Sequence, residues 1–137
     1  RGEGMTEIEA IKSILFKDPL VSFAYLFGSR VSGKVSERSD WDIAIYIRDE
    51  LLEKNPIWQK FKIENELSAI LKTDSVETVV LNSLDNPLLG FEIISKGMLV
   101  LNKNEESRIA FEGRVLGRYQ DWEYFMRRHM EPPIIPL

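Results

Sequence analysis

Two aspartates and a glycine-serine pair are the residues of this chain whose types and spacing could do chemistry. Asp40 and Asp42 are two positions apart at the start of an apolar run that reaches Ile47. Alternate side chains of a strand share one face, with Cα atoms roughly 6–7 Å apart, so the two carboxylates can hold one or two magnesium ions between them. Gly28 and Ser29 end an earlier apolar run, and residues 30–39 separate them from Asp40. Their backbone N–H groups and hydroxyl could bind phosphate, so the combination predicts nucleotide chemistry.

Each half of this pattern has a structural alternative. A glycine-serine turn after a strand is common and usually binds nothing, because short motifs often match by chance. The two acids could instead lie at a solvent-exposed strand end, paired with Arg38 or Arg48. This alternative explains Asp40 alone better than it explains both acids, because two like charges on one face repel each other unless a cation lies between them.

A two-metal site needs a third carboxylate, and Asp74 and Glu77 are the candidates near the apolar run 75–81. Their odd spacing places them on opposite faces of a strand, so strand geometry lets only one of them join the aspartate pair. Glu77 lies inside the run, whereas Asp74 stands at its start, where turn residues are common. We therefore prefer Glu77, with a solvent-paired glutamate as the alternative.

The composition limits the other kinds of site. The chain of 137 residues suits one domain, and its net charge of -4 comes without a basic stripe, so no direct nucleic-acid binding is expected. The absence of cysteine excludes disulfides and thiolate zinc sites, and the single histidine, His129, leaves oxygen ligands for any metal. No apolar stretch approaches the roughly 18 residues that span a bilayer, and no signal peptide is recognised, so we expect a cytoplasmic protein with no membrane contact.

Strands and helices alternate along the chain, which predicts one α/β domain over residues 5–131. Thr6 and Glu9 are typical of a capping box and predict a helix over 6–17. Strands are expected over 21–27, 40–47, 75–81 and 98–101, and further helices over 29–33, 51–71 with a break at 55–56, 87–97 and 104–129. Asn86 or Asp85 is the expected cap of the helix at 87.

We expect residues 1–4, which precede Met5, to be a cloning remnant, and residues 132–137 to be a flexible tail.

The last predicted helix carries more apolar residues than one core-facing stripe needs. The stripe contains Ile109, Leu116, Tyr119, Trp122, Met126 and Met130, and it is widened by Phe111, Val115 and Phe125. We expect it to pack on the sheet, with a surface for a partner protein as the alternative. Gly113 and Gly117 each disfavour a helix by about 1 kcal/mol relative to alanine, which close approach of another helix or fraying of this one would explain.

The motif around the two acids resembles the nucleotidyltransferases of the DNA polymerase beta superfamily. The resemblance is carried by Phe27, Gly28, Ser29, Arg30 and Gly33, and then by the run Ser39, Asp40, Trp41, Asp42, Ile43, Ala44 and Ile45. Residues 76–82 and 91–101 are similar to the minimal nucleotidyltransferase (MNT) branch. Residues 111–112 and 119–121 resemble members of this branch that act as antitoxins to HEPN ribonucleases. The resemblance implies a small mixed sheet of about four strands packed with helices, followed by a long C-terminal helix.

The resemblance also implies roles for the site residues. Asp40 and Asp42 would bind Mg²⁺ against the triphosphate of ATP, and Glu77 would be the third carboxylate, in a place where many relatives have aspartate. The residues that would contact the nucleotide are Gly28, Ser29, Arg30 and Ser39. For Arg30 and Ser39 the alternative is that they anchor the loop. Since phosphoryl transfer depends on positioning and charge neutralisation, no histidine base is needed.

Three functions follow from this interpretation. The preferred one is Mg²⁺-dependent transfer of AMP from ATP to a tyrosine hydroxyl of a cognate HEPN ribonuclease toxin, which would make the chain an antitoxin. The second is an antitoxin that neutralises its toxin by binding alone. The third is a nucleotidyltransferase that modifies a small molecule such as an antibiotic, for which the short chain leaves little room to build an acceptor pocket. The paired acids favour catalysis, because a discarded site has no reason to retain them.

Overall fold

The computed structural model describes residues 3–33 and 40–129 of the chain. Helix α1 (Glu3–Lys17) begins before Thr6, so the predicted capping box is wrong. Residues 3–5 already have helical backbone, which places Thr6 and Glu9 inside the helix and not at its cap. The helix therefore includes Glu3 and Gly4, which the sequence analysis assigned to a cloning remnant. The predicted tail at 132–137 lies outside the described residues.

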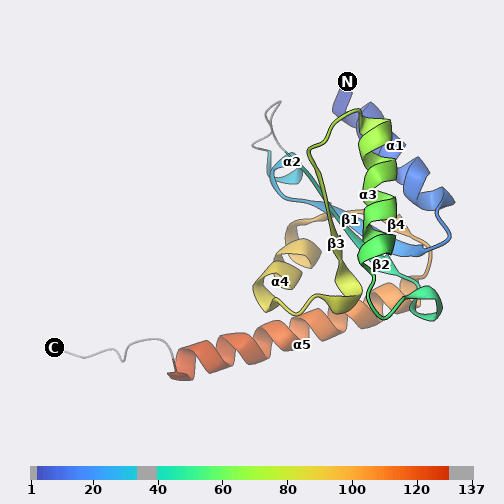
Figure 1. Ribbon diagram of the computed structural model, residues 1–137. Coiled ribbons are helices and arrows are strands. Elements are labelled where there is room, and N and C mark those ends of the chain that lie inside the picture. Colours follow the sequence, from blue (N-terminus) through green and yellow to red (C-terminus); the bar gives the residue numbers. More distant parts are fainter. Residues whose placement is uncertain (1–2, 34–39, 130–137) are drawn as a thin grey trace.

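Four strands form one mixed sheet in the order β3-β2-β1-β4. They are β1 (Val21–Phe27), β2 (Trp41–Ile47), β3 (Val76–Val80) and β4 (Met98–Asn102). Strand β1 pairs antiparallel with both β2 and β4, whereas β2 and β3 are parallel. A parallel pair needs a crossover connection, and α3 (Ile57–Leu71) provides it (Figure 1). The predicted α/β fold with a small mixed sheet is confirmed.

Helices cover both faces of the sheet, which buries its two central strands (Figure 1). Side chains of α1 and α3 pack on one face, where they meet alternate residues of β2, namely Trp41, Ile43, Ile45 and Ile47. Side chains of α4 (Pro87–Lys96) and α5 (Glu105–His129) pack on the other face, against Ala44 and Tyr46. The period of two along a strand therefore sends Trp41 to the first face and its neighbours Asp40 and Asp42 toward the second.

The shorter elements follow the signals in the sequence. Helix α2 (Ser29–Ser32) is a single turn directly after β1, as predicted. The predicted break at 55–56 is confirmed, because α3 begins only at Ile57 and residues 49–51 form a separate 3-10 turn. Asn86 caps α4, since its Oδ1 accepts hydrogen bonds from the N–H groups of Leu88 and Leu89, each at 3.1 Å. None of the helices in the described part of the chain is both long and apolar enough to cross a membrane.

Helix α5 packs on the sheet, as predicted, but only one edge of the predicted stripe is buried there. Its buried side chains are Phe111 and Val115, whereas Ile109 and Leu116 of the predicted stripe are 54% and 42% exposed. The second half of the helix extends past α4 and away from the sheet (Figure 1). The helix is crowded with apolar residues on several sides, so its periodicity could not select the face that the sheet covers.

Gly113 and Gly117 lie within an unbroken α5, which excludes fraying as their explanation. A Cβ added at either glycine would meet no atom of the described residues within 4 Å. No other helix of the described chain therefore approaches these two glycines closely.

Candidate active site

The candidate site lies at the end of the sheet where β1 finishes and β2 and β3 begin. Asp42 pairs with Phe27 across β1 and β2, and with Glu77 across β2 and β3. Residues directly opposite each other on neighbouring strands point to the same face, so Asp42 and Glu77 share one side of the sheet. The face predicted for the aspartate pair and the preference for Glu77 as their neighbour are consistent with this register.

Gly28 brings the turn after β1 against the first of these acids. Its backbone angles, φ 83° and ψ -155°, belong to a region that is essentially restricted to glycine. A Cβ at this position would overlap Oδ2 of Asp42 and lie 3.2 Å from its Cγ. The carbonyl oxygen of Gly28 accepts hydrogen bonds from the N–H groups of Val31 and Ser32, at 3.0 and 3.1 Å, so the turn leads directly into α2. The absence of a side chain is what allows the turn and the carboxylate to approach.

The acids influence one another electrostatically. Burial, followed by the charges of Asp40 and Glu77, raises the pKa of the Asp42 carboxyl above its ordinary value. A cation between these groups would relieve that repulsion, and carboxylate oxygens are the ligands that magnesium prefers. Within the described residues, however, no three acidic or histidine side chains are arranged closely enough to hold a metal ion. The donor types fit Mg²⁺, while the described side chains do not form a finished three-ligand cage.

The two candidates for the third carboxylate both lie near Asp40. A hollow of about 220 Å³ is lined by Asp40, Asp74, Ser75, Val76 and Glu77. Glu77 is in register with Asp42 on β3, whereas Asp74 precedes the strand. Of these two candidates, Glu77 is the one whose charge, after burial and the charge of Asp40, contributes to the raised pKa of Asp42, which favours Glu77 as the closer neighbour of that carboxylate.

The remaining residues predicted for the site are Ser29, Arg30 and Ser39, and the structure describes the first two. Ser29 is the first residue of α2, immediately after Gly28. The guanidinium of Arg30 stacks on the indole of Trp41, with its Cζ 4.1 Å from the ring centroid. This contact fits the anchoring alternative considered for Arg30, although the sequence did not predict Trp41 as its partner. Ser39 and Arg38 lie outside the described residues.

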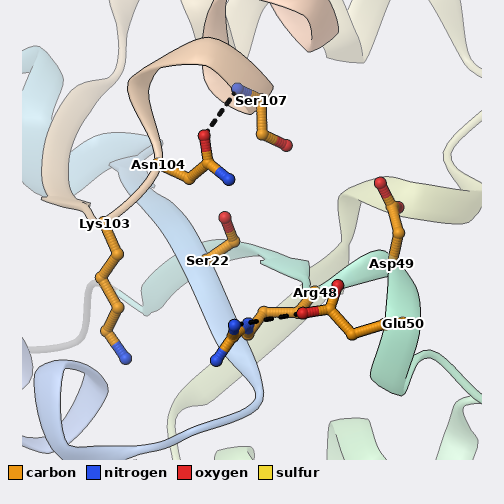
Figure 2. Close-up of a pocket in the computed structure, with 7 residues that line it drawn as sticks. All are labelled: Ser22, Arg48, Asp49, Glu50, Lys103, Asn104 and Ser107. Atoms are coloured by element: carbon orange, nitrogen blue, oxygen red, sulfur yellow. Dashed lines mark hydrogen bonds and ion pairs between the residues drawn. The ribbon is translucent and has the colours of Figure 1, made fainter.

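Arg48 cannot neutralise the aspartate pair, because it lies at the opposite end of β2. There it forms an ion pair with Glu50 at 3.1 Å. Figure 2 shows these two residues in a second hollow, of about 240 Å³. The lining residues are Ser22, Arg48, Asp49, Glu50, Lys103, Asn104 and Ser107.

The polar groups of this second hollow are mostly engaged within the protein. Lys103 Nζ donates to the carbonyl of Asp18 at 2.8 Å, and Asn104 Oδ1 accepts from the N–H of Ser107 at 3.0 Å. Arg48 and Lys103 are balanced by Asp49 and Glu50. We therefore place the candidate active site at the aspartate end of the sheet.

Comparisons with known proteins identify the family to which the chain belongs. Residues 9–106 match the family described as "Polymerase beta, Nucleotidyltransferase". The chain is 29% identical over 109 residues to a protein adenylyltransferase MntA of Aphanizomenon flos-aquae (strain 2012/KM1/D3), an alignment that covers 75% of this chain and 71% of that protein.

Two solved structures share the fold at lower sequence identity. One is of a tri-AMPylated Shewanella oneidensis HEPN toxin in complex with its MNT antitoxin, with a TM-score of 0.67, 20% identity, and coverage of 91% of this chain and 93% of the matched chain. The other is a toxin–antitoxin with AMP-PNP, with a TM-score of 0.68, 21% identity, and coverage of 90% and 92%. The family match spans most of the chain, from α1 into α5, and includes the glycine turn and the acids at the sheet end. This chain belongs to the polymerase beta nucleotidyltransferase family.

Proposed function

We propose that this chain is a Mg²⁺-dependent antitoxin that transfers AMP from ATP to a tyrosine hydroxyl of a cognate HEPN ribonuclease toxin. The observation that carries the proposal is the contact of Gly28 with Asp42, on the face that Asp42 shares with Glu77. It places a glycine-serine turn suited to phosphate beside carboxylates suited to a metal. The relative named as a protein adenylyltransferase, and the solved antitoxin complexed with a tri-AMPylated toxin, support the choice of AMP and of a toxin as acceptor.

The residues would divide the work of phosphoryl transfer among them. Asp40 and Asp42 would hold Mg²⁺, and Glu77 would complete the acidic group. When bound, Mg²⁺ neutralises triphosphate charge and lowers the pKa of the acceptor hydroxyl. Gly28 would let the backbone approach the triphosphate, and the Ser29 hydroxyl would donate to a phosphate oxygen.

The transfer itself forms one bond and breaks one. The tyrosine oxygen bonds to the α-phosphorus of ATP, the bond from that phosphorus to the bridging oxygen breaks, and pyrophosphate leaves. Glu77, on the same face as Asp42, would position the tyrosine hydroxyl and accept its proton. Positioning and charge neutralisation supply most of the catalysis in such reactions, so the single histidine, His129, has no role in the proposal.

One observation favours a second candidate, an antitoxin that acts by binding alone. Within the described residues, no three acidic or histidine side chains are arranged to hold a metal ion, which an antitoxin acting by binding alone would not need. This candidate predicts a stable complex with the toxin in which the acids at the sheet end are dispensable. The third candidate is modification of a small molecule, which the hollow of about 220 Å³ lined by Asp40 and Glu77 would have to accept as its substrate.

The test uses the chain, the product of the neighbouring gene as the toxin candidate, Mg²⁺ and ATP labelled on the α-phosphate. Label on a toxin tyrosine, lost in both Asp40→Asn and Asp42→Asn but kept in Asp74→Asn, supports the proposed enzyme. Complex formation without label, unchanged in the Asp40 and Asp42 variants, supports the binding antitoxin. Label that appears only on added small molecules supports the third candidate and contradicts the first.

A further inference from the structure

Trp41 separates the two candidate metal aspartates in sequence but faces away from them. Its indole lies on the face of the sheet covered by α1 and α3, is 2% exposed, and belongs to the core cluster that also contains Ile43 and Ile45. Its backbone N–H donates to the carbonyl of Ser75 at 2.8 Å, which fixes the start of β2 to the start of β3. The ring is therefore a rigid part of the core, directly beneath the strand end that carries both acids.

Arg30 joins this rigid ring to α2. Its Cζ lies 4.1 Å from the centroid of the indole, a distance typical of a cation–π contact. Arg30 is the second residue of α2, and Gly28 occupies the N-cap position of that helix. A shift of Arg30 off the ring would therefore move the glycine-serine turn as well.

Helix α2 has few other attachments among the described residues. It is a single turn, none of its residues is buried, and only Val31 packs against the main core cluster. Its two N–H bonds, from Val31 and Ser32, both return to Gly28 within the same turn. These local bonds shape the turn but do not attach it to the sheet. The packing of Val31 on the core and the contact between Arg30 and Trp41 attach it.

We propose that Trp41 is a positioning residue: it holds Arg30 by its indole face and, through α2, keeps the Gly28 and Ser29 turn in place against Asp42. The inference rests on the proposed function of this end of the sheet as a nucleotide site. In this proposal Arg30 does not contact the nucleotide itself. Arg30 and Trp41 both affect triphosphate binding by holding the turn at Gly28 and Ser29 in place. It also explains why a large aromatic residue stands between two acids, where any apolar side chain could have filled the core.

The test is a double-mutant cycle with Trp41→Leu and Arg30→Met, which remove the aromatic face and the cation while retaining apolar volume. Binding of Mg²⁺–AMP-PNP is measured without toxin, together with KM for ATP and kcat in AMP transfer. Each single variant should weaken nucleotide binding and raise KM by about 10-fold, with a smaller change in kcat. The double variant should be no weaker than either single variant, because both remove the same contact.

Conservative variants separate positioning from simple loss of structure. Trp41→Phe keeps an aromatic face and Arg30→Lys keeps a cation, so both should recover most of the nucleotide affinity. A purely structural role would lower the melting temperature and the active fraction while leaving KM unchanged, and that result overturns the proposal. Losses that multiply in the double variant overturn it too, because they show that the two residues act independently. If Trp41→Leu does not fold, the pair Arg30→Met and Trp41→Phe decides the question through the same KM measurement.

The nucleotide measurements also distinguish failure of this inference from failure of the proposed function. In one outcome, the double variant binds AMP-PNP no more weakly than either single variant, but no AMP is transferred to the toxin. This result supports the positioning role of Trp41 and contradicts the proposed transfer. Transfer to the toxin with no coupling between the two residues retains the enzyme and contradicts the positioning role. Absence of nucleotide binding in the unchanged chain contradicts both.

Discussion

The carboxylate of Asp42 lies against Gly28, at the place where any other residue would carry its β-carbon. Two features produce this contact. The antiparallel register places Asp42 opposite the last residue of β1, and the positive φ of Gly28 turns the chain over it. The same contact explains why a glycine stands at position 28.

Gly28→Ala should weaken nucleotide binding more than any other glycine substitution in the motif. The new methyl group would overlap Asp42 Oδ2, and the backbone region would disfavour alanine by about 1–3 kcal/mol. Isothermal titration with Mg²⁺–AMP-PNP measures the affinity, and thermal unfolding measures the backbone strain. Gly33→Ala is the matched control, because Gly33 also has a positive φ, of 90°, but has open space around its α-carbon. Equal losses of affinity in the two variants would contradict a specific role for the contact with Asp42.

Asp42→Asn should abolish transfer while leaving the apo protein as stable as before or more stable. The folded-state pKa of Asp42 is raised, so its ionisation disfavours the fold. That cost is absent below the unfolded-state pKa and fully present above the folded-state pKa, which includes neutral pH. Melting curves without metal should therefore show no decrease for Asp42→Asn at pH 7, while label transfer should fall by more than about 100-fold. A marked fall in the apo melting temperature would mean that the carboxylate has a structural partner.

Glu77→Gln and Asp74→Asn should differ in their effects on activity, although both residues line the same hollow. Glu77 is in register with Asp42, and its charge raises the pKa of that carboxyl, whereas Asp74 precedes the strand. We expect Glu77→Gln to lower kcat by about 10-fold or more and Asp74→Asn to leave it nearly unchanged. The reverse order, measured with α-labelled ATP and the toxin, would transfer the third-carboxylate role to Asp74.

Tyr25→Phe should destabilise the protein without changing its affinity for the nucleotide. The buried phenol donates a hydrogen bond to Glu112 of α5, which also accepts from Arg108 at 3.1 Å. Burial, and then the bond to Glu112, raises the pKa of Tyr25 far above its ordinary value, so the phenol remains a donor. Its loss should lower the free energy of unfolding by about 1–2 kcal/mol.

Chemical denaturation measures the effect of Tyr25→Phe, with Glu123→Gln as the control on the same helix. Glu123 pairs with Arg127 at 3.3 Å on an exposed face, where such pairs contribute roughly 0–1 kcal/mol. A weaker effect of Tyr25→Phe than of the control would show that the bond to Glu112 does not hold α5 on the sheet.

The sequence by itself determined the local structure and the face of the acids. Glycine, proline and asparagine mark where elements end, so the bounds of β1 and the Asn86 cap of α4 could be predicted from neighbours in the chain. The period of two along a strand placed Asp40 and Asp42 on one side and allowed only one of Asp74 and Glu77 to join them, and the position of Glu77 inside its apolar run favoured Glu77. These inferences need only short-range geometry, which the residues nearby in sequence supply.

Only the tertiary structure decided which distant groups meet. It stacked Arg30 on Trp41, and it buried Phe111 and Val115 of α5 while leaving Ile109 and Leu116 of the same predicted stripe exposed. The physical reason is that these contacts depend on strand register and on the angle at which each helix crosses the sheet. A helix with apolar residues on several sides gains similar burial from more than one face, and only packing against a particular sheet selects between them.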